Sequence, residues 1–183
     1  MAQTATLYSF EVELAHVDRG VYASLAFRVA QHPSETDEAL LTRVLAYCLE
    51  YTDGLQFSSK GLSAPEEPPL AVRDATGALL AWIEIGVPDA ARLHKASKSA
   101  PRVAVYTHKD PARLLRLLDG ERIHRRDAIE IYAVDRTFLA EWVARLDRRM
   151  KCDLSVSDGQ IYLILGEATL TGVLARCTLD VSS

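Results

Sequence analysis

Residues 70–86 read LAVRDATGALLAWIEIG, two apolar segments joined by a polar turn at Ala75-Thr76-Gly77. This pattern predicts a β-hairpin, because turn residues separate two runs of strand-like composition. The second run is apolar on both faces of the expected strand, which is typical of a strand in the interior of a covered sheet. The hairpin therefore predicts the middle of a sheet with further elements packed around it.

Downstream of the hairpin, helices alternate with strands. Pro88 and Asp89 begin an Ala-rich helix that we expect to end near Ser99, before Pro101. The next segments predict a strand, a helix, a strand and an amphipathic helix, in this order: RVAVYTH (102–108), DPARLLRLLDG (110–120), AIEIYAV (128–134) and DRTFLAEWVARLDRRM (135–150).

Both ends of the chain have the alternating pattern of strands. Two runs separated by Asp18-Arg19-Gly20 predict a long N-terminal hairpin, and a run that turns at Asp158-Gly159 predicts antiparallel C-terminal strands. Together these elements predict a single α/β domain over residues 1–183. We expect a mixed sheet flanked by helices, with the N-terminal hairpin and the C-terminal antiparallel strands attached to it.

Composition limits the class of protein. The chain has 183 residues, 49% of them hydrophobic, which is enough for one domain with a sizeable core. No apolar run approaches the roughly 20 residues that cross a membrane, and the first ten residues lack the apolar segment of a signal peptide. Cys48, Cys152 and Cys177 lack metal-ligand spacing, so we expect buried free thiols. These features predict a cytoplasmic protein that does not contact membranes.

Charge is distributed unevenly along the chain. Residues 1–90 contain 13 acidic and 5 basic residues, whereas residues 91–126 contain 10 basic and 3 acidic residues. The net charge of −4 argues against an indiscriminate nucleic-acid coat. An acidic first half and a basic middle would suit a metal site beside a phosphate-binding surface. Solvated helix faces that differ only in sign explain the same distribution.

The segment HPSETDEALLTRVLAYCLEY (32–51) predicts a helix that begins with acidic residues. Ser34 followed by Asp37 resembles a capping box, and acids at a helix N-terminus interact favourably with its dipole. Glu38 is different, because a step of about 100° per residue puts it within the apolar arc of Leu41 and Leu45. A carboxylate on a buried face needs a hydrogen-bonding partner, a proton or a metal ion.

A second acid, Glu84, ends the buried strand of the central hairpin. With the turn centred between Ala75 and Thr76, the antiparallel register puts Glu67 opposite Glu84 and Pro69 opposite Trp82. Two carboxylates on the hairpin and Glu38 on the helix packed against it would make an oxygen-rich site suited to Mg²⁺, with Mn²⁺ as a substitute. We therefore predict Glu38, Glu67 and Glu84 as metal ligands and catalytic residues.

The helix after Glu84 presents Lys95 and Lys98 one turn apart. A lysine beside a hydrated metal could orient the attacking water and stabilise a pentavalent phosphate, so both lysines are also predicted catalytic residues. Together with Arg92 and Arg102 they form the predicted nucleic-acid-binding set. A purely structural role, with the acids held in salt bridges to Lys95 and Lys98, predicts the same proximity.

The arrangement resembles a known superfamily. A helix acid, a hairpin acid and then (D/E)-x-K resemble the PD-(D/E)XK phosphodiesterases. Seven ordered motifs across the chain resemble the YaeQ family, which is regarded as a divergent branch of that superfamily. This resemblance implies a restriction-endonuclease-like fold. The motifs are HPSETDE, FSSKGLS, EEPPL, WIEIGVPD, RLHKA, VAVYTH and SDGQIYL.

By this resemblance, Glu38 matches the helix acid and Glu84 matches the acid of (D/E)-x-K. Two positions depart from the pattern. Gly86 stands at the lysine position, so Lys95 or Lys98 would supply the amine, and Pro69 stands where an Asp is usual, which leaves Glu67.

Two functions follow from these observations. The first is a metal-dependent nuclease that acts on DNA or RNA, favoured by Glu38, Glu84 and the nearby lysines. The second is a nuclease-fold protein without catalysis that binds a nucleic acid or a protein partner, for example in transcription. Gly86, Pro69 and the negative net charge favour the second.

Overall fold

One continuous ten-stranded sheet runs through the molecule in the order β2-β1-β8-β9-β10-β7-β6-β5-β4-β3. The computed structural model describes residues 4–59 and 66–179. The elements in these residues are β1 (Thr6–His16), the 3-10 helix η1 (Val17–Arg19), β2 (Val21–Gln31), α1 (Asp37–Leu49), β3 (Leu55–Phe57), β4 (Leu70–Arg73), β5 (Leu79–Ile85), α2 (Ala90–Ser99), β6 (Arg102–Thr107), α3 (Pro111–Leu118), the 3-10 helix η3 (Arg126–Ala128), β7 (Glu130–Val134), α4 (Arg136–Val143), β8 (Arg149–Ser157), β9 (Gln160–Leu165) and β10 (Ala168–Cys177).

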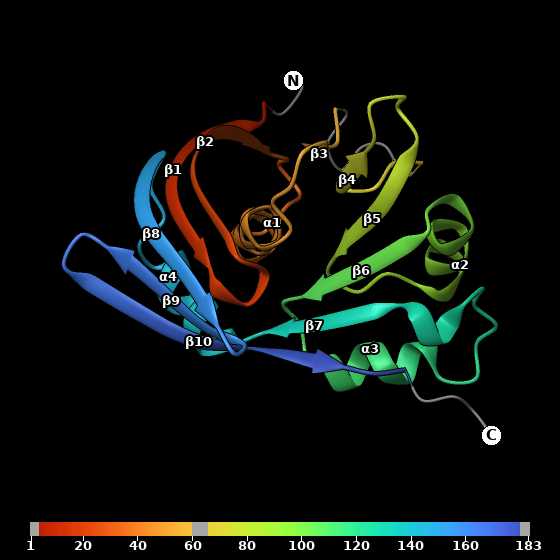
Figure 1. The fold of residues 1–183 in the computed structure, drawn as a ribbon. Coiled ribbons are helices and arrows are strands. Elements are labelled where there is room, and N and C mark those ends of the chain that lie inside the picture. Colours follow the sequence, from red (N-terminus) through yellow and green to blue (C-terminus); the bar gives the residue numbers. More distant parts are fainter. Residues whose placement is uncertain (1–3, 60–65, 180–183) are drawn as a thin grey trace.

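The sheet has a strongly curved half and a flatter half (Figure 1). Strands β1, β2, β8, β9 and the start of β10 curve around α1 so that the sheet is nearly barrel-shaped, and β3 to β7 form the other half. The first part of β10 pairs with β9 and its last part, from Leu174, pairs with β7. The predicted mixed α/β fold, with its N-terminal hairpin and C-terminal antiparallel strands, is confirmed at this level.

The middle of the chain follows the predicted alternation. Strands β3, β4 and β5 are antiparallel neighbours, and β6 and β7 then continue the sheet parallel to β5. The carboxyl ends of β5, β6 and β7 therefore lie at one edge of the sheet. The prediction that the central hairpin lies within the sheet is confirmed, because β5 is flanked by β4 and β6.

Helix α1 packs into the concave face of the sheet, and α4 covers it from another side. Leu41 and Leu45 are fully buried against the sheet, as predicted. Full burial of a Leu side chain contributes about 1.5–3 kcal/mol. Leu40 and Val44 are also fully buried, so the buried arc of α1 is wider than one amphipathic stripe and is centred farther from Glu38 than the sequence suggested.

Helices α2 and α3 cover the opposite face of β5 and β6 (Figure 1). Alternation along β5 sends Trp82 to that face and Ile83 to the face of α1. On the covered side, Trp82 and Val105 pack with Leu93 of α2 and Leu114 of α3. The central hairpin is thus buried on both sides, as its composition predicted. None of the helices in the described ranges is long and apolar enough to cross a membrane.

Two predicted boundaries are wrong. The helix predicted over residues 135–150 ends at Val143, and Arg149–Ser157 is the strand β8. Met150 and Cys152 are buried and pair with β1, so the alternating apolar pattern of a strand outweighs the helical pattern there. The first helix is capped by Thr36 instead of Ser34, since its hydroxyl oxygen accepts a hydrogen bond from the backbone N–H of Ala39.

The register of the central hairpin also differs from the prediction. Leu70 pairs with Ile83 and Ala71 with Trp82, a pattern that puts Pro69 instead of Glu67 opposite Glu84. The carboxylate of Asp74 accepts hydrogen bonds from the backbone N–H groups of Thr76 and Ala78, which makes the turn longer. A bulge at Val72/Arg73 lies just before this turn in the chain. A shift of two residues leaves each strand side chain on its predicted face, because side chains alternate with period two.

The cysteines are free in this structure, as predicted. Cys48 and Cys152 are buried, and Cys177 is half-buried. Burial raises the pKa of Cys152 to about 12, so its thiol stays protonated at neutral pH and behaves as part of the apolar core.

Candidate functional site

Glu84 lies in a buried ion pair on the α2 side of the sheet. Only 4% of the residue is exposed. Its Oε2 accepts a hydrogen bond from Trp82 Nε1 at 3.0 Å and one from Arg92 Nε at 2.6 Å. The Arg92 guanidinium also lies 5.5 Å from the centre of the Trp82 ring and donates to the backbone carbonyl of Glu67 at 3.1 Å. Arg92 therefore links the Glu84 carboxylate to the backbone of Glu67, whereas the predicted pairing of the two carboxylates across the hairpin is not formed.

In the described ion pairs, Glu84 is not paired with either predicted lysine. Lys95 forms its ion pair with Glu66, and Lys98 is exposed. The carboxylate of Glu67 accepts a hydrogen bond from the Ser58 hydroxyl at 2.9 Å. The cation beside Glu84 is Arg92 instead of Lys95 or Lys98, because Arg92 lies one turn nearer the N-terminus of α2.

Glu38 is exposed, so the prediction of a buried Glu38 carboxylate is wrong. The buried acid of this segment is Glu35. Its two carboxylate oxygens accept hydrogen bonds from Arg43, from Nη2 at 2.8 Å and from Nε at 3.0 Å. Burial raises the pKa of Glu35, while Arg43 opposes that shift. Glu38 also lies on a helix that packs on the other face of the sheet from the Glu84 carboxylate, so the two acids do not converge.

These placements bear on the predicted metal site. Within residues 4–59 and 66–179, no three His, Cys, Asp or Glu side chains are close enough to share an ion. The Glu84 carboxylate is bound by Arg92 and Trp82, and Glu38 is on the opposite face. Glu38, Glu67 and Glu84 therefore do not fit a single Mg²⁺ or Mn²⁺ ion in this arrangement.

Glu38 instead lines a pocket of about 550 Å³ at the carboxyl end of β6. The pocket lies between the first turns of α1 and α4 and the segment that follows β6. Ligand sites in open α/β sheets commonly occupy this edge, beyond the carboxyl ends of parallel strands. Its lining residues are Glu38, His108, Lys109, Arg136, Thr137, Leu139 and Ala140.

Two cations of this pocket are open to ligands. Lys109 and Arg136 are exposed, and neither forms an ion pair with another described residue. Asp135 caps α4 by accepting hydrogen bonds from the backbone N–H groups of Thr137 and Phe138. The positive ends of α1 and α4 add to the charge of Lys109 and Arg136 at this edge.

His108 is the titratable base of the pocket. Burial lowers the pKa of His108, Lys109 lowers it further, and the Glu38 carboxylate acts in the opposite direction. The ring is therefore neutral at pH 7. Its Nδ1 is buried and has no hydrogen-bond partner among the described residues.

Gly86, which the sequence comparison with (D/E)-x-K placed at the lysine position, lies beside His108. The residue has φ of +96°, which side chains rarely adopt, and a Cβ there would lie 3.7 Å from the His108 ring. The backbone conformation thus explains why the position holds glycine, and His108 and Lys109 directly follow the neighbouring strand β6.

The predicted nucleic-acid set does not form one surface. Arg102 is held by Glu50 and Glu130 on the face of α1, whereas Arg92, Lys95 and Lys98 are on α2 on the other face. The sequence reasoning missed His108, Lys109 and Arg136. A polar triplet, His108 to Asp110, directly after a buried strand, was the signal that could have indicated this edge.

The chain is similar to known proteins over nearly its whole length. The family model described as YaeQ protein matches residues 1–173. The YaeQ protein of Escherichia coli (strain K12) is 34% identical over 165 residues, covering 89% of this chain and 90% of that protein. The YaeQ protein of Salmonella typhi is 33% identical over 164 residues, with the same coverage.

Solved structures agree with this match. The crystal structure of the YaeQ protein from Xanthomonas axonopodis pv. citri superposes with a TM-score of 0.87 at 31% identity, covering 97% of this chain and 100% of that one. The YaeQ protein from Pseudomonas syringae gives a TM-score of 0.85 at 31% identity, with 97% and 98% covered. Sequence and fold together show that the chain belongs to the YaeQ family.

Proposed function

We propose that this protein binds a nucleic-acid strand and holds a backbone phosphate in the pocket at the carboxyl end of β6. The observation that carries this proposal is that Lys109 and Arg136, two exposed cations outside any described ion pair, line one pocket with Glu38 and His108. With His108 neutral, the cations outnumber the single acid. A phosphodiester carries one negative charge and matches that balance.

A track of further cations supports a polymer as the ligand. Helix α3 begins two residues after Lys109, with Asp110 as its N-cap, and its exposed positions include Arg113 and Arg116. We propose that a strand whose phosphate occupies the pocket continues from Lys109 along α3 toward these side chains, because α3 begins directly after the pocket. Binding that depends on several phosphate contacts weakens steeply with salt, because each contact releases counterions.

The order of elements supports a restriction-endonuclease-like origin for this fold. Helix α1, the meander β3-β4-β5, helix α2 and strand β6 follow the pattern of helix acid, hairpin acid and (D/E)-x-K. The ion pair between Glu84 and Arg92 supports binding without metal-dependent cleavage, since the acid that would hold the metal already has a cationic partner.

Cleavage in the same pocket is a second candidate function. It is favoured by His108, which is neutral at pH 7, has an unpartnered buried Nδ1 and lies near the Glu38 carboxylate. A neutral imidazole could accept a proton from an attacking water. Lys109 and Arg136 would stabilise the charge that develops on the phosphate.

Fluorescence anisotropy with labelled single-stranded DNA and RNA tests the binding proposal. The double variant Lys109→Ala/Arg136→Ala should bind at least about tenfold more weakly, and its salt slope should fall by about two. The control is Arg28→Ala/Lys151→Ala, which removes the same charge from exposed strand positions of the curved half. Equal affinities of the two double variants would contradict the proposal.

A cleavage assay separates the two candidate functions. The labelled strands are incubated with protein in EDTA and in Mg²⁺, with His108→Ala as the comparison. Intact strands under all conditions support binding alone. Fragments that form in EDTA and disappear with His108→Ala support metal-independent hydrolysis in the pocket.

A further inference from the structure

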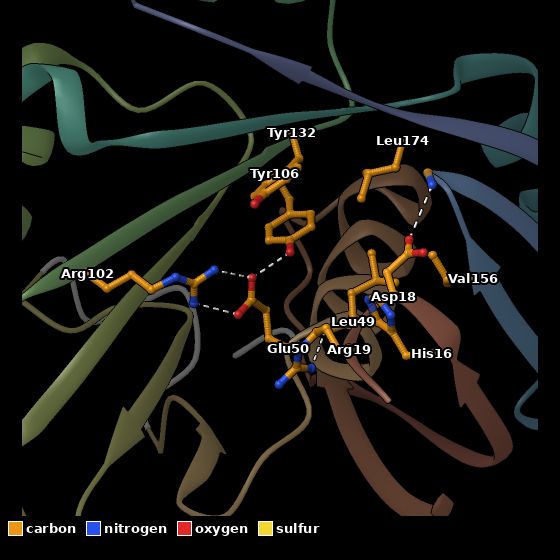
Figure 2. Close-up of a pocket in the computed structure, with 11 residues that line it drawn as sticks. His16, Asp18, Arg19, Leu49, Glu50, Arg102, Tyr106, Tyr132, Val156 and Leu174 are labelled. Atoms are coloured by element: carbon orange, nitrogen blue, oxygen red, sulfur yellow. Dashed lines mark hydrogen bonds and ion pairs between the residues drawn. The ribbon is translucent and has the colours of Figure 1, made fainter. Parts of the chain in front are cut away.

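A second pocket, of about 460 Å³, lies at the other end of α1, between the curved and flat halves of the sheet (Figure 2). It differs in position and in lining from the pocket at the carboxyl end of β6, so an inference about it does not depend on the proposed function. Its volume is within the range of about 300–1,000 Å³ that is usual for small-molecule sites.

One wall of this pocket is a fixed polar network. Arg102 donates to Glu50 through Nη1 at 2.7 Å and Nη2 at 3.0 Å, and to Glu130 through Nε at 2.7 Å. The Tyr106 hydroxyl donates to Glu50 at 2.6 Å, and the Tyr132 hydroxyl donates to Glu130 at 2.7 Å. Burial and the bond to Glu130 raise the pKa of Tyr132 to about 12, so this wall keeps its protons at neutral pH.

The opposite side has polar groups with capacity for a ligand. His16 is only 8% exposed, and its buried Nδ1 has no hydrogen-bond partner in the described part of the chain. Such an atom costs free energy unless something bonds to it. Arg19 donates through Nη1 to the Leu49 carbonyl at 2.7 Å, which leaves further N–H groups of its guanidinium for an anion. This side of the pocket therefore offers a ligand one acceptor, on His16, and further N–H donors, on Arg19.

The charges that line the pocket are balanced. Arg19 and Arg102 face Asp18 and Glu50, and burial lowers the pKa of His16 so that the ring is neutral. The Asp18 oxygens are occupied by backbone N–H groups of the β8–β9 turn. Among the described residues, Oε2 of Glu50 accepts a hydrogen bond from Arg102 alone, so it can accept another donor. Because these charges cancel, the pocket favours neither a ligand with only a negative charge nor a ligand with only a positive charge.

The rest of the lining is apolar and includes Leu49, Val156 and Leu174. We propose that this pocket binds a small zwitterion, a free α-amino acid with an apolar side chain. Its carboxylate pairs with the Arg19 guanidinium, its ammonium donates to Glu50 and the His16 ring, and its side chain packs on the apolar wall. Each free polar group of the pocket is then satisfied, which no purely apolar or singly charged ligand achieves.

Thermal melts and calorimetry of the full chain test this proposal with L-leucine as the probe. Leucine should raise the melting temperature in a concentration-dependent way, because a ligand that binds only the folded state stabilises it. Leucinol lacks the carboxylate and N-acetyl-leucine lacks the ammonium, so both should bind at least about tenfold more weakly. Equal binding of either analogue would overturn the zwitterion assignment.

Two variants place the ligand in this pocket. Arg19→Gln should weaken leucine binding at least about tenfold, whereas Arg28→Gln, a matched loss of charge on the outer strand β2, should leave it unchanged. His16→Leu should also weaken binding, because a leucine side chain at this position has no acceptor for the ammonium. A melting temperature that leucine does not change in the wild-type protein, or binding that survives Arg19→Gln, would overturn the proposal.

Discussion

The two ends of α1 meet charged side chains of two different kinds. At the carboxyl end, Glu50 belongs to a network in which Arg102 has two carboxylate partners and two tyrosine hydroxyls complete the hydrogen bonding. At the amino end, Lys109 and Arg136 are exposed and have no described ion-pair partner. Ion pairs and hydrogen bonds between elements hold those elements together, whereas cations without described partners are available to an outside anion. Substitutions at the two ends should therefore affect different properties.

The largest effect is expected for Arg102→Met. The substitution leaves the buried Glu50 and the partly buried Glu130 without the cation that bridges them. Removal of one partner of a fully buried pair costs about 3–5 kcal/mol, and the 38% exposure of the Arg102 side chain reduces our expectation to about 2–3 kcal/mol. Urea denaturation would measure this loss. An unchanged free energy of unfolding would mean that the network does not hold α1 to the sheet.

A smaller loss is expected for Glu84→Gln, about 1–2 kcal/mol. Gln still accepts a hydrogen bond from Trp82 but removes the charge that faces Arg92. Thermal melts with and without Mg²⁺ measure both the stability and any metal binding. A more stable apo variant, together with a Mg²⁺-induced shift seen only in the wild-type protein, would show that Glu84 belongs to a metal site after all.

Lowering the pH should reduce the free energy of unfolding, because His16, near the carboxyl end of α1, has a lowered pKa in the folded protein. Burial lowers the pKa of His16 and Arg19 adds to this, while Asp18 and Glu50 oppose it. The unfolded chain therefore binds the proton first, so stability is highest above the unfolded pKa of about 6.5 and falls as the pH drops below it. The expected slope is below about 1.4 kcal/mol per pH unit. Urea midpoints from pH 7.5 to 5.5 should depend less on pH in His16→Gln, and equal slopes would exclude this histidine as the cause.

The smallest effect on stability is expected for Lys109→Ala. Exposed positions without partners usually change the free energy of unfolding by less than about 0.5 kcal/mol. The same substitution should lower nucleic-acid affinity and reduce the salt slope by about one, which anisotropy would measure. A loss of stability comparable to that of Arg102→Met would remove the distinction between the two ends of α1.

Local patterns predicted much of this fold. The alternation around residues 70–86 identified a buried hairpin, and the order of helices and strands identified the neighbours of that hairpin. The register of the hairpin was predicted wrongly. It depends on hydrogen bonds that the turn donates to the Asp74 carboxylate and on a bulge at Val72/Arg73. Neither feature has a distinct composition signal.

The candidate site was predicted less well than the fold. Glu84 is buried, as its place in the strand predicted, but its cation is Arg92 instead of a lysine, and Arg92 links it to the backbone of Glu67 and not to the Glu67 carboxylate. Glu38 was placed on a buried face because the helix was treated as having one apolar stripe. A helix surrounded by a curved sheet and by α4 has a broader and rotated buried arc. That curvature arises from pairings across the whole chain, so no window around Glu38 contains it.

The pairing of β1 with β8 has a consequence for how the chain is made. Ser9 to His16 lie in parallel register with Arg149 to Val156, and β10 joins the two halves of the sheet by pairing with both β9 and β7. During synthesis the N-terminal hairpin must therefore wait for most of the chain to leave the ribosome before its inner strand gains a second neighbour. Contacts this distant in sequence slow folding. The exposed edge of a waiting hairpin is also a hazard for aggregation, so we expect the nascent protein to be most vulnerable shortly before its last strands emerge.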